Sequence, residues 1–399
     1  MLKKAQVLTP TTQLTVFAYV RGHAVNWLLL FLPVSMVLAG LHAAELAIFL
    51  TAALAIIPLA GAIGSATEAL AARVGPGIGG LLNATFGNAT EFIIAIVALQ
   101  AGLVQVVKAS ISGSIIGNLL LVIGVSMFAG GWGRERQTFN RVHAGASAAM
   151  LVLAVIALVM PAVFDLTVNS QINEHLNAGN VQALSLLVAV VMLCIYGASL
   201  IFSLKTHREI FDVDATPARA RLNIPNALTL LITATVLTAV ESELLVGAIG
   251  HATQALGMTE FFVGVIVVAI IGNAAEHFSA IDMARRNQMD LAMTIGTASS
   301  TQIALFVAPI LVFLSYLIGH PMTLVFNVFE VVGIGLAVLI MVVVSLDGES
   351  NWFEGLQLVA VYLILAIVFF FVPKSALANA GRFTAPPPGV TIVAPPSPH

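Results

Sequence analysis

Eleven apolar runs follow one another along this 399-residue chain. Each approaches or exceeds the roughly 20 residues that a helix needs to cross the hydrocarbon core of a bilayer. Only 9% of the residues are charged, against about 25% in ordinary soluble domains. The sequence therefore predicts an all-α polytopic membrane protein with about 11 transmembrane helices. Their approximate spans are 25–41, 43–72, 77–102, 106–130, 142–163, 178–204, 226–255, 259–284, 289–318, 322–346 and 353–372.

Lysines and arginines predict the orientation of these spans, because cytoplasmic loops keep an excess of them. With the N-terminus in the cytoplasm, thirteen fall on the cytoplasmic side and only Lys108, Lys374 and Arg382 on the other side. The first run is interpreted as a membrane anchor, because it lacks a convincing small-x-small cleavage site. Compact loops and no organellar targeting peptide favour a bacterial inner (plasma) membrane.

A duplicated motif divides the chain into two halves. GNATEFIIAI (87–96) and GNAAEHFSAI (272–281) agree at six of ten positions. One lies in the third run and the other in the eighth, five crossings apart, so the two halves have opposite topology. This is the inverted-repeat pattern of secondary transporters. The expected organisation is a cytoplasmic N-terminus (1–24), an extra N-terminal helix (25–41), a first inverted repeat (43–204), a cytoplasmic central loop (205–225), a second inverted repeat (226–372) and a Pro-rich disordered tail (373–399).

Glu91 and Glu276 are the residues of these motifs that most need an explanation. An ionisable group deep in a bilayer costs on the order of 2.5–3.5 kcal/mol on insertion. Asn88 and Asn273 precede them by three residues, a spacing that places amide and carboxylate on one helical face. The glycine before each asparagine lets a helix loosen and turn carbonyls toward an ion. The duplication favours an ion-binding and proton-binding centre over protonated glutamates that only join helices.

Neutral polar residues in the run after each motif are further candidate ligands. Asn118 aligns with Gln302 when residues 108–124 are set against 293–309 with a one-residue slip. For the small hydroxyl residues and the histidine, helix packing is the alternative. Glu330 and Glu45 are expected to have interface or scaffold roles. The additional candidates for ligand or access-path roles are Asn118, Gln302, Ser114, Ser299, Ser300, His277, Glu68 and Glu243.

Two carboxylates among amide and carbonyl oxygens form a hard, oxygen-rich site. Such a site suits Ca²⁺, which accepts about six to eight oxygens in flexible geometry. A soft metal would require thiolates or several histidines, and the chain has a single cysteine. A carboxylate pair holds either Ca²⁺ or protons, which is the competition that exchange requires. No cofactor is expected, and Ca²⁺ is the transported substrate.

With GNATEF, GNAAEH, SSTQIALFVAP and KASISGSIIGN in view, the chain resembles the calcium/proton exchangers of the calcium/cation antiporter superfamily, from about residue 25 to 372. The resemblance implies one extra helix plus two inverted five-helix repeats, and an antiporter that exports cytosolic Ca²⁺ in exchange for H⁺ by alternating access. The central loop lacks the long acidic run of some members, which argues against regulation by Ca²⁺ there. The family's acidic and amide positions map onto Glu91, Glu276, Asn88, Asn273, Asn118 and Gln302. Asn118 and Gln302 favour proton coupling, because sodium/calcium relatives usually carry more acidic or hydroxyl ligands at the centre of the site.

Two other functions stay open at this point. A Na⁺- or K⁺-coupled calcium exchanger would have the same fold and site, and proton release on Ca²⁺ binding in sodium-free buffer would separate the two. A membrane-embedded hydrolase is disfavoured, because an HExxH pair, a Ser/His or paired-Asp arrangement and a nucleotide-phosphate loop are missing. The expected partners are Ca²⁺, H⁺ and the lipid bilayer; the net charge of -3 excludes a nucleic-acid partner, and a homo-oligomer stays open.

Overall fold

A computed structural model describes residues 24–74, 76–169, 174–207 and 222–375, and these are almost entirely helical. The predicted N-terminus, most of the central loop and nearly all of the tail lie outside the described residues. The elements in chain order are η1 (Ala24–Leu30), α2 (Phe31–Gly40), α3 (Glu45–Val74), α4 (Pro76–Phe86), α5 (Ala89–Gln100), α6 (Val104–Ile116), η2 (Gly117–Val122), α7 (Ile123–Gly131), β1 (Gln137–Thr138), α8 (Arg141–Asn169), α9 (Glu174–Ile201), η3 (Phe202–Thr206), α11 (Ile224–Leu256), α12 (Glu260–Phe262), η4 (Val263–Val268), α13 (Ala269–Gly272), α14 (Ala274–Arg285), α15 (Met289–Gln302), η5 (Ile303–Val307), α16 (Ala308–Ile318), α17 (Val328–Val344), β2 (Glu349–Ser350) and α18 (Trp352–Phe371).

Seven helical stretches of the described residues are long and apolar enough to cross a membrane, and an eighth is the bent pair Glu260–Gly272 and Ala274–Arg285. Three shorter apolar helices, Val25–Gly40, Ala89–Gln100 and Val328–Val344, lie at the remaining predicted runs. The prediction of an all-α polytopic membrane protein is therefore confirmed. The total of eleven crossings stays a prediction.

The tenth run departs from the prediction of a helix over 322–346. α17 begins only at Val328, and residues 322–327 are buried but not helical. Backbone at membrane depth is stable in this form only where other protein groups satisfy it. Side chains do so here, as when Ser185 Oγ accepts a hydrogen bond of 3.0 Å from the Leu324 N–H. Apolar periodicity did not distinguish this segment from helix, because it is as apolar as its surroundings.

Asparagine side chains begin three of the long helices. Asn223, Asn327 and Asn351 cap α11, α17 and α18, each accepting a first-turn backbone N–H at 2.9–3.1 Å. An asparagine oxygen at this position satisfies a donor that the helix itself leaves unpaired. At the opposite ends of α11 and α16, Gly257 and Gly319 have φ of 66° and 91°. Glycine adopts this left-handed conformation without a Cβ clash.

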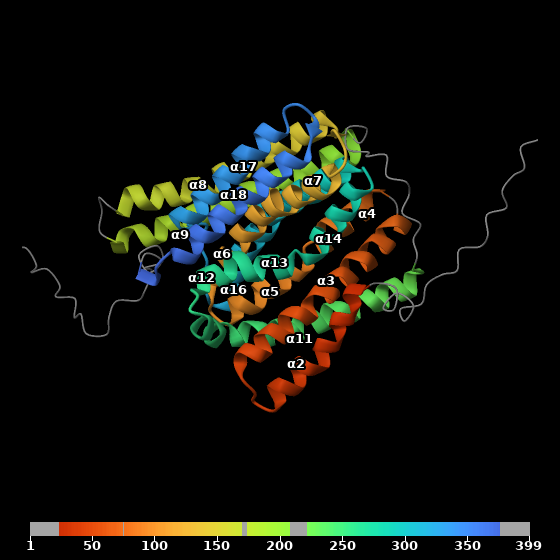
Figure 1. The fold of residues 1–399 in the computed structure, drawn as a ribbon. Coiled ribbons are helices and arrows are strands. Elements are labelled where there is room, and N and C mark those ends of the chain that lie inside the picture. Colours follow the sequence, from red (N-terminus) through yellow and green to blue (C-terminus); the bar gives the residue numbers. More distant parts are fainter. Residues whose placement is uncertain (1–23, 75, 170–173, 208–221, 376–399) are drawn as a thin grey trace, which may run out of the picture.

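The helices form a layered arrangement that buries the duplicated motifs in the middle. Figure 1 shows α2, α3 and α11 along one side, and α8, α9, α17 and α18 along the other, with α5, α6, α13 and α14 between them. α3 and α11 pack along each other, α3 also contacts α14, and α11 also contacts α5. The first helix of each half therefore packs on the motif helix of the other half.

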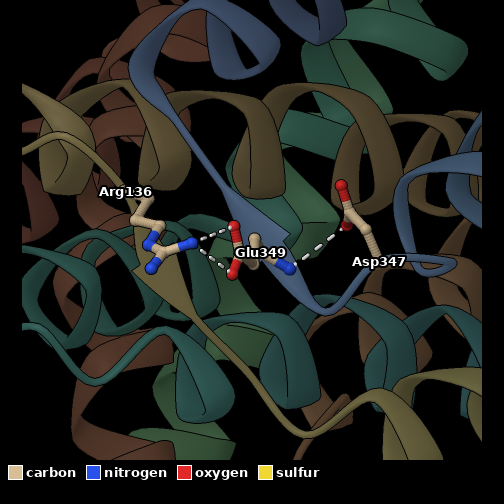
Figure 2. Close-up of polar contacts among 3 residues, drawn as sticks. All are labelled: Arg136, Asp347 and Glu349. Atoms are coloured by element: carbon tan, nitrogen blue, oxygen red, sulfur yellow. Dashed lines mark hydrogen bonds and ion pairs between the residues drawn. The ribbon is translucent and has the colours of Figure 1, made fainter.

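Two short strands join loops at one end of the molecule. β1 and β2 pair antiparallel, and beside them Arg136 Nη1 donates to both carboxylate oxygens of Glu349, at 2.8 and 3.0 Å (Figure 2). Asp347 Oδ1 accepts from the Glu349 backbone N–H at 3.1 Å. In the same region Gln137 Nε2 donates to the Ala284 carbonyl at 3.0 Å. All three loops are predicted on the cytoplasmic side, so these contacts agree with the predicted alternation of spans.

Contacts at the opposite end agree with the alternation as well. His251 at the end of α11 forms an ion pair with Glu45 at the start of α3. Lys108 Nζ donates to the Val325 carbonyl at 2.7 Å. Lys108 lies within α6, as the predicted span 106–130 has it, and is only 6% exposed. The ammonium group is tolerated there because a backbone carbonyl accepts its hydrogen bond.

Candidate functional site

Both duplicated motifs break their helices at the same position. α4 and α5 are separated by Gly87 and Asn88, and α13 and α14 by Asn273, where the axis bends by 57°. Asn88 (φ -104°, ψ 30°) and Asn273 (φ -88°, ψ 11°) occupy equivalent N-cap positions. The helix loosening predicted at the two glycines is therefore present in the structure. Each break begins a new helix within the protein interior, which is the architecture of transporter ion sites.

Glu91 and Glu276 lie in the first turns of the helices that begin at these breaks. The N-terminus of a helix carries a partial positive charge that favours an anion. Both carboxylate oxygens of Glu91 are buried and have no hydrogen-bond partner among the described residues. Glu276 is half-buried and follows Gly272, the residue against which the Glu91 side chain lies, by four positions. Each half therefore places one carboxylate at its helix break, and the Glu91 oxygens keep free lone pairs.

Gly272 makes room for this arrangement. A Cβ atom at Gly272 would lie 2.9 Å from Glu91 Cγ and 3.4 Å from Glu91 Cδ. Carbon atoms are in favourable contact only at about 3.5–4.0 Å, so a side chain at this position would displace the carboxylate. The glycine of the second motif thus fixes where the glutamate of the first can lie.

A buried chain of hydrogen bonds, which we call the amide chain, surrounds the two breaks. Asn88 Nδ2 donates to Gln302 Oε1 at 2.6 Å, and Ser299 Oγ donates to Asn88 Oδ1 at 2.7 Å. Asn118 Nδ2 lies 2.9 Å from both Ser299 Oγ and Asn273 Oδ1. Asn273 Nδ2 completes the chain by donating to a serine hydroxyl at 2.7 Å. The members, in order, are Gln302, Asn88, Ser299, Asn118, Asn273 and Ser114.

The amide chain alternates between the two halves of the molecule at every link. The Asn88–Gln302 bond has its counterpart in the Asn273–Asn118 bond, as expected if the two halves are related by a twofold axis. Buried amides are costly unless their groups pair, and here they pair mainly with one another. Asn118 Oδ1 and Gln302 Nε2 stay without a partner among the described residues. Together with the carboxylate oxygens of Glu91, the Asn118 oxygen is available to a cation.

The other predicted candidates lie elsewhere. Ser300 Oγ donates to the Gly296 carbonyl at 2.9 Å, and His277 is half-buried beside Glu276. Glu68 is an exposed residue of α3. Glu243 is exposed on α11 and lines a cavity of about 260 Å³ that Glu45 also lines. These positions suit access paths or packing better than membership of the amide chain.

Two further carboxylates are buried outside the amide chain. Glu241, fully buried on α11, accepts a hydrogen bond of 2.7 Å from Ser35 Oγ of α2. Glu330, expected to have an interface or scaffold role, is only 1% exposed. Its signal in the sequence was Asn327, three residues earlier, which forms a capping box with it. Among the described residues no group of three or more His, Cys, Asp or Glu side chains could hold a metal, so a cation would need the amide oxygens as well.

Comparisons with known proteins place the chain among ion exchangers. The family model described as sodium/calcium exchanger protein matches residues 44–205 and 226–371. The chain is 47% identical to the Ca²⁺/H⁺ antiporter of Aphanothece halophytica over 362 residues, covering 87% of this chain and 96% of that protein. It is 43% identical to the Ca²⁺/H⁺ antiporter ChaA of Bacillus subtilis over 344 residues, covering 85% and 96%. The solved structure of native YfkE matches with a TM-score of 0.76 at 40% identity, covering 87% of this chain and 100% of YfkE.

Proposed function

The chain belongs to the sodium/calcium exchanger protein family, and we propose that it exports Ca²⁺ from the cytosol in exchange for H⁺. Relatives that share 43–47% of its sequence over nearly their whole length are named Ca²⁺/H⁺ antiporters. The chain is accordingly a secondary transporter and not an enzyme. The proposed seat of exchange is the pair Glu91 and Glu276, with Asn88 and Asn273 as further ligands.

One observation carries the site proposal: each half-helix that begins at Asn88 or Asn273 has a glutamate in its first turn, and the Glu91 side chain lies against Gly272 at the break of the other half. Oxygen ligands of this kind suit Ca²⁺. Metal ligands must be deprotonated, so Ca²⁺ binding to two carboxylates releases any protons they hold. Protons and Ca²⁺ then exclude each other at one site, and that exclusion couples their movements.

The amide chain supports the choice of protons as the counter-ion. Asn118 and Gln302 occupy equivalent positions, hydrogen-bonded to the asparagines of the two breaks, and contribute neutral groups only. With no further acid at these positions, the site has two carboxylates to neutralise. Two protons neutralise them as fully as one Ca²⁺ does, so the site is uncharged in both loaded states. The empty site, with two bare carboxylates, is costly to enclose, which discourages movement without an ion.

Energetics explains why coupling is needed. Exporting Ca²⁺ against a ~10⁴-fold gradient costs about 5.5 kcal/mol. Moving its two charges against ~100 mV adds about 4.6 kcal/mol. Two protons returning cancel the electrical contribution, and a third would reverse it. Passive movement of Ca²⁺ supplies neither the concentration cost nor the electrical cost of export.

We also propose the orientation and organisation predicted from the sequence. The N-terminus faces the cytoplasm, and the membrane is a bacterial inner membrane. The inverted repeats are residues 43–204 and 226–372, a division supported by the two stretches, 44–205 and 226–371, that the family model matches. All members of the amide chain come from one chain, so the site requires no second copy.

Calcium uptake into inside-out vesicles or proteoliposomes under an imposed pH gradient, in sodium-free and potassium-free buffer, tests the function. Glu91→Gln and Glu276→Gln are each expected to abolish uptake while leaving the protein folded. Glu349→Gln, which changes an exposed carboxylate, is the matched control and should transport normally. Normal uptake by either site variant would contradict the paired-carboxylate mechanism. Uptake that appears only after Na⁺ or K⁺ is added would favour the alternative coupling ion.

A further inference from the structure

A second buried polar cluster joins the start of α6 to the region where α17 begins. Every member is buried, with 6% exposure at Lys108 and 1% at Glu330. Neither charged residue takes part in the amide chain. The cluster therefore needs an explanation of its own. Its members, which we call the lysine cluster, are Lys108 and Ser112 of α6, Thr323, Val325 and Asn327 of the non-helical segment, and Glu330 of α17.

Hydrogen bonds satisfy both charged residues of the lysine cluster. Lys108 Nζ donates to the Val325 carbonyl at 2.7 Å and lies 3.3 Å from Thr323 Oγ1. Ser112 Oγ lies 2.9 Å from the Lys108 carbonyl and 3.1 Å from Glu330 Oε1. The other oxygen of Glu330 accepts from the backbone N–H of its capping partner at 2.8 Å. The negative charges of Glu330 and of Asp165 on α8 also act on the ammonium group. An ammonium at this depth is thereby compensated and tied to the non-helical backbone.

α6 carries the lysine cluster on one face and Ser114 of the amide chain on another, and Asn118 lies in η2, which continues α6. Lys108 and Ser112 are four residues apart and share one face. Ser114 follows Lys108 by six residues, which places it about 120° around the helix. Asn118, four residues further on, continues the face of Ser114. The lysine cluster thus holds α6 on one face while another face presents groups to Asn273.

The equivalent helix of the other half is held in a comparable way. α15, which presents Ser299 and Gln302, contacts α8 as α6 contacts α17. At its start Asp290 accepts a hydrogen bond from the Asn140 backbone N–H, and Thr294 Oγ1 lies 3.3 Å from His143 Nδ1. The chemistry differs between the halves, but the location is the same. Both ligand-bearing helices are therefore anchored by polar contacts to the fourth helix of the opposite half.

We propose that Lys108 and Glu330 are positioning residues for ion exchange. They fix the rotation and depth of α6, so that Ser114 and Asn118 stay hydrogen-bonded to Asn273 across the two halves. This inference rests on the proposed function, because it gives Lys108 and Glu330 a role in positioning groups of the proposed exchange site. Neither residue touches the transported ion in this account. Their loss acts through the amide chain.

The test measures the Michaelis constant (KM) for Ca²⁺ and the maximal rate of pH-driven Ca²⁺ uptake by the full chain in proteoliposomes. Lys108→Met removes the donor to Val325, so α6 is released and the KM for Ca²⁺ should rise at least about fivefold, with a smaller change in maximal rate. Lys205→Met, which removes an exposed lysine of η3, is the matched control and should leave KM unchanged.

A double variant separates positioning from folding. Lys108→Met with Glu330→Gln removes both charges of the lysine cluster, and the glutamine can still accept from the Asn327 backbone N–H, so this protein should fold. It still lacks the donor to Val325, and the proposal therefore predicts a raised KM. A folded double variant with the KM of the unchanged protein would overturn the proposal. If the unchanged protein shows no pH-driven uptake, the proposed function fails instead. In that case the equilibrium Ca²⁺ affinity of the purified double variant is compared with that of the unchanged protein. Weaker binding by the double variant supports the positioning role, and equal binding overturns it.

Discussion

Gly272→Ala adds one methyl group next to the candidate site. Its Cβ would lie 2.9 Å from Glu91 Cγ, about 0.6–1.1 Å inside the favourable carbon–carbon distance. The backbone of Gly272 is helical, so alanine itself causes no backbone strain. The clash therefore acts on the glutamate. Glu91 must move away from Gly272 and so from its present position at the candidate site.

The size of the expected change in KM follows from the free-energy cost of overpacking the interior. One methylene forced into a packed interior costs about 1–3 kcal/mol. The ion-free protein can relieve this strain by moving the Glu91 carboxylate, but Ca²⁺ binding must return the carboxylate toward the methyl group. The strain then appears in the affinity for Ca²⁺. At ~1.4 kcal/mol per decade, the KM for Ca²⁺ should rise roughly 5- to 140-fold.

The assay is initial Ca²⁺ uptake as a function of Ca²⁺ concentration in proteoliposomes with an imposed pH gradient. Gly117→Ala is the matched control. Gly117 is also buried and adjacent to Asn118, but a Cβ there would meet nothing within 4 Å. Its KM should stay within about twofold, because surrounding space absorbs the methyl group. A Gly272→Ala protein with unchanged KM would refute the placement of Glu91 at the ion site.

Three further outcomes are expected. Lowering the pH on the side from which Ca²⁺ is loaded should raise the apparent KM for Ca²⁺ by up to about tenfold per pH unit for each displaced proton. The measurement is Ca²⁺ uptake at a fixed pH gradient. A KM that does not change with pH would contradict competition between Ca²⁺ and protons. Arg136→Ala breaks an exposed ion pair with Glu349 and should cost at most about 1 kcal/mol in thermal unfolding, with unchanged uptake. Ser35→Ala removes the hydrogen bond to buried Glu241 and should lower stability by about 1–3 kcal/mol, whereas an unchanged melting temperature would show that this bond contributes little.

Much of the fold was predictable because apolar length and charge placement are strong signals in membrane proteins. The start of α17 shows where these signals fail. Residues 322–327 are apolar and buried, yet they form no helix, because side chains far along the sequence satisfy their backbone. Hydropathy measures the environment of a segment and not its hydrogen-bond partners. The same limit applies to Lys108, whose hydrogen bond to the Val325 carbonyl could not be predicted from hydropathy.

The sequence predicted which residues belong to the candidate site better than it predicted the contacts between them. The duplicated Gly-Asn-x-x-Glu pattern identified the two carboxylates and their asparagines from the sequence. The pairing of Asn88 with Gln302, and of Asn118 with Asn273, depends on two helices of opposite halves lying side by side. One sequence carries no record of such distances. Ser299 and Ser300 illustrate the consequence: they are neighbours of the same type, but only Ser299 faces the amide chain.

The central claim is that Ca²⁺ and protons compete for Glu91 and Glu276. The most direct measurement is proton release when Ca²⁺ is added to the purified protein in weakly buffered, sodium-free solution, followed with a pH indicator. The claim predicts proton release that saturates with Ca²⁺ and is reduced or lost in Glu91→Gln and Glu276→Gln, with Glu349→Gln unaffected. Saturable Ca²⁺ binding without proton release across the pH range where uptake occurs, or unchanged release in both site variants, would contradict it.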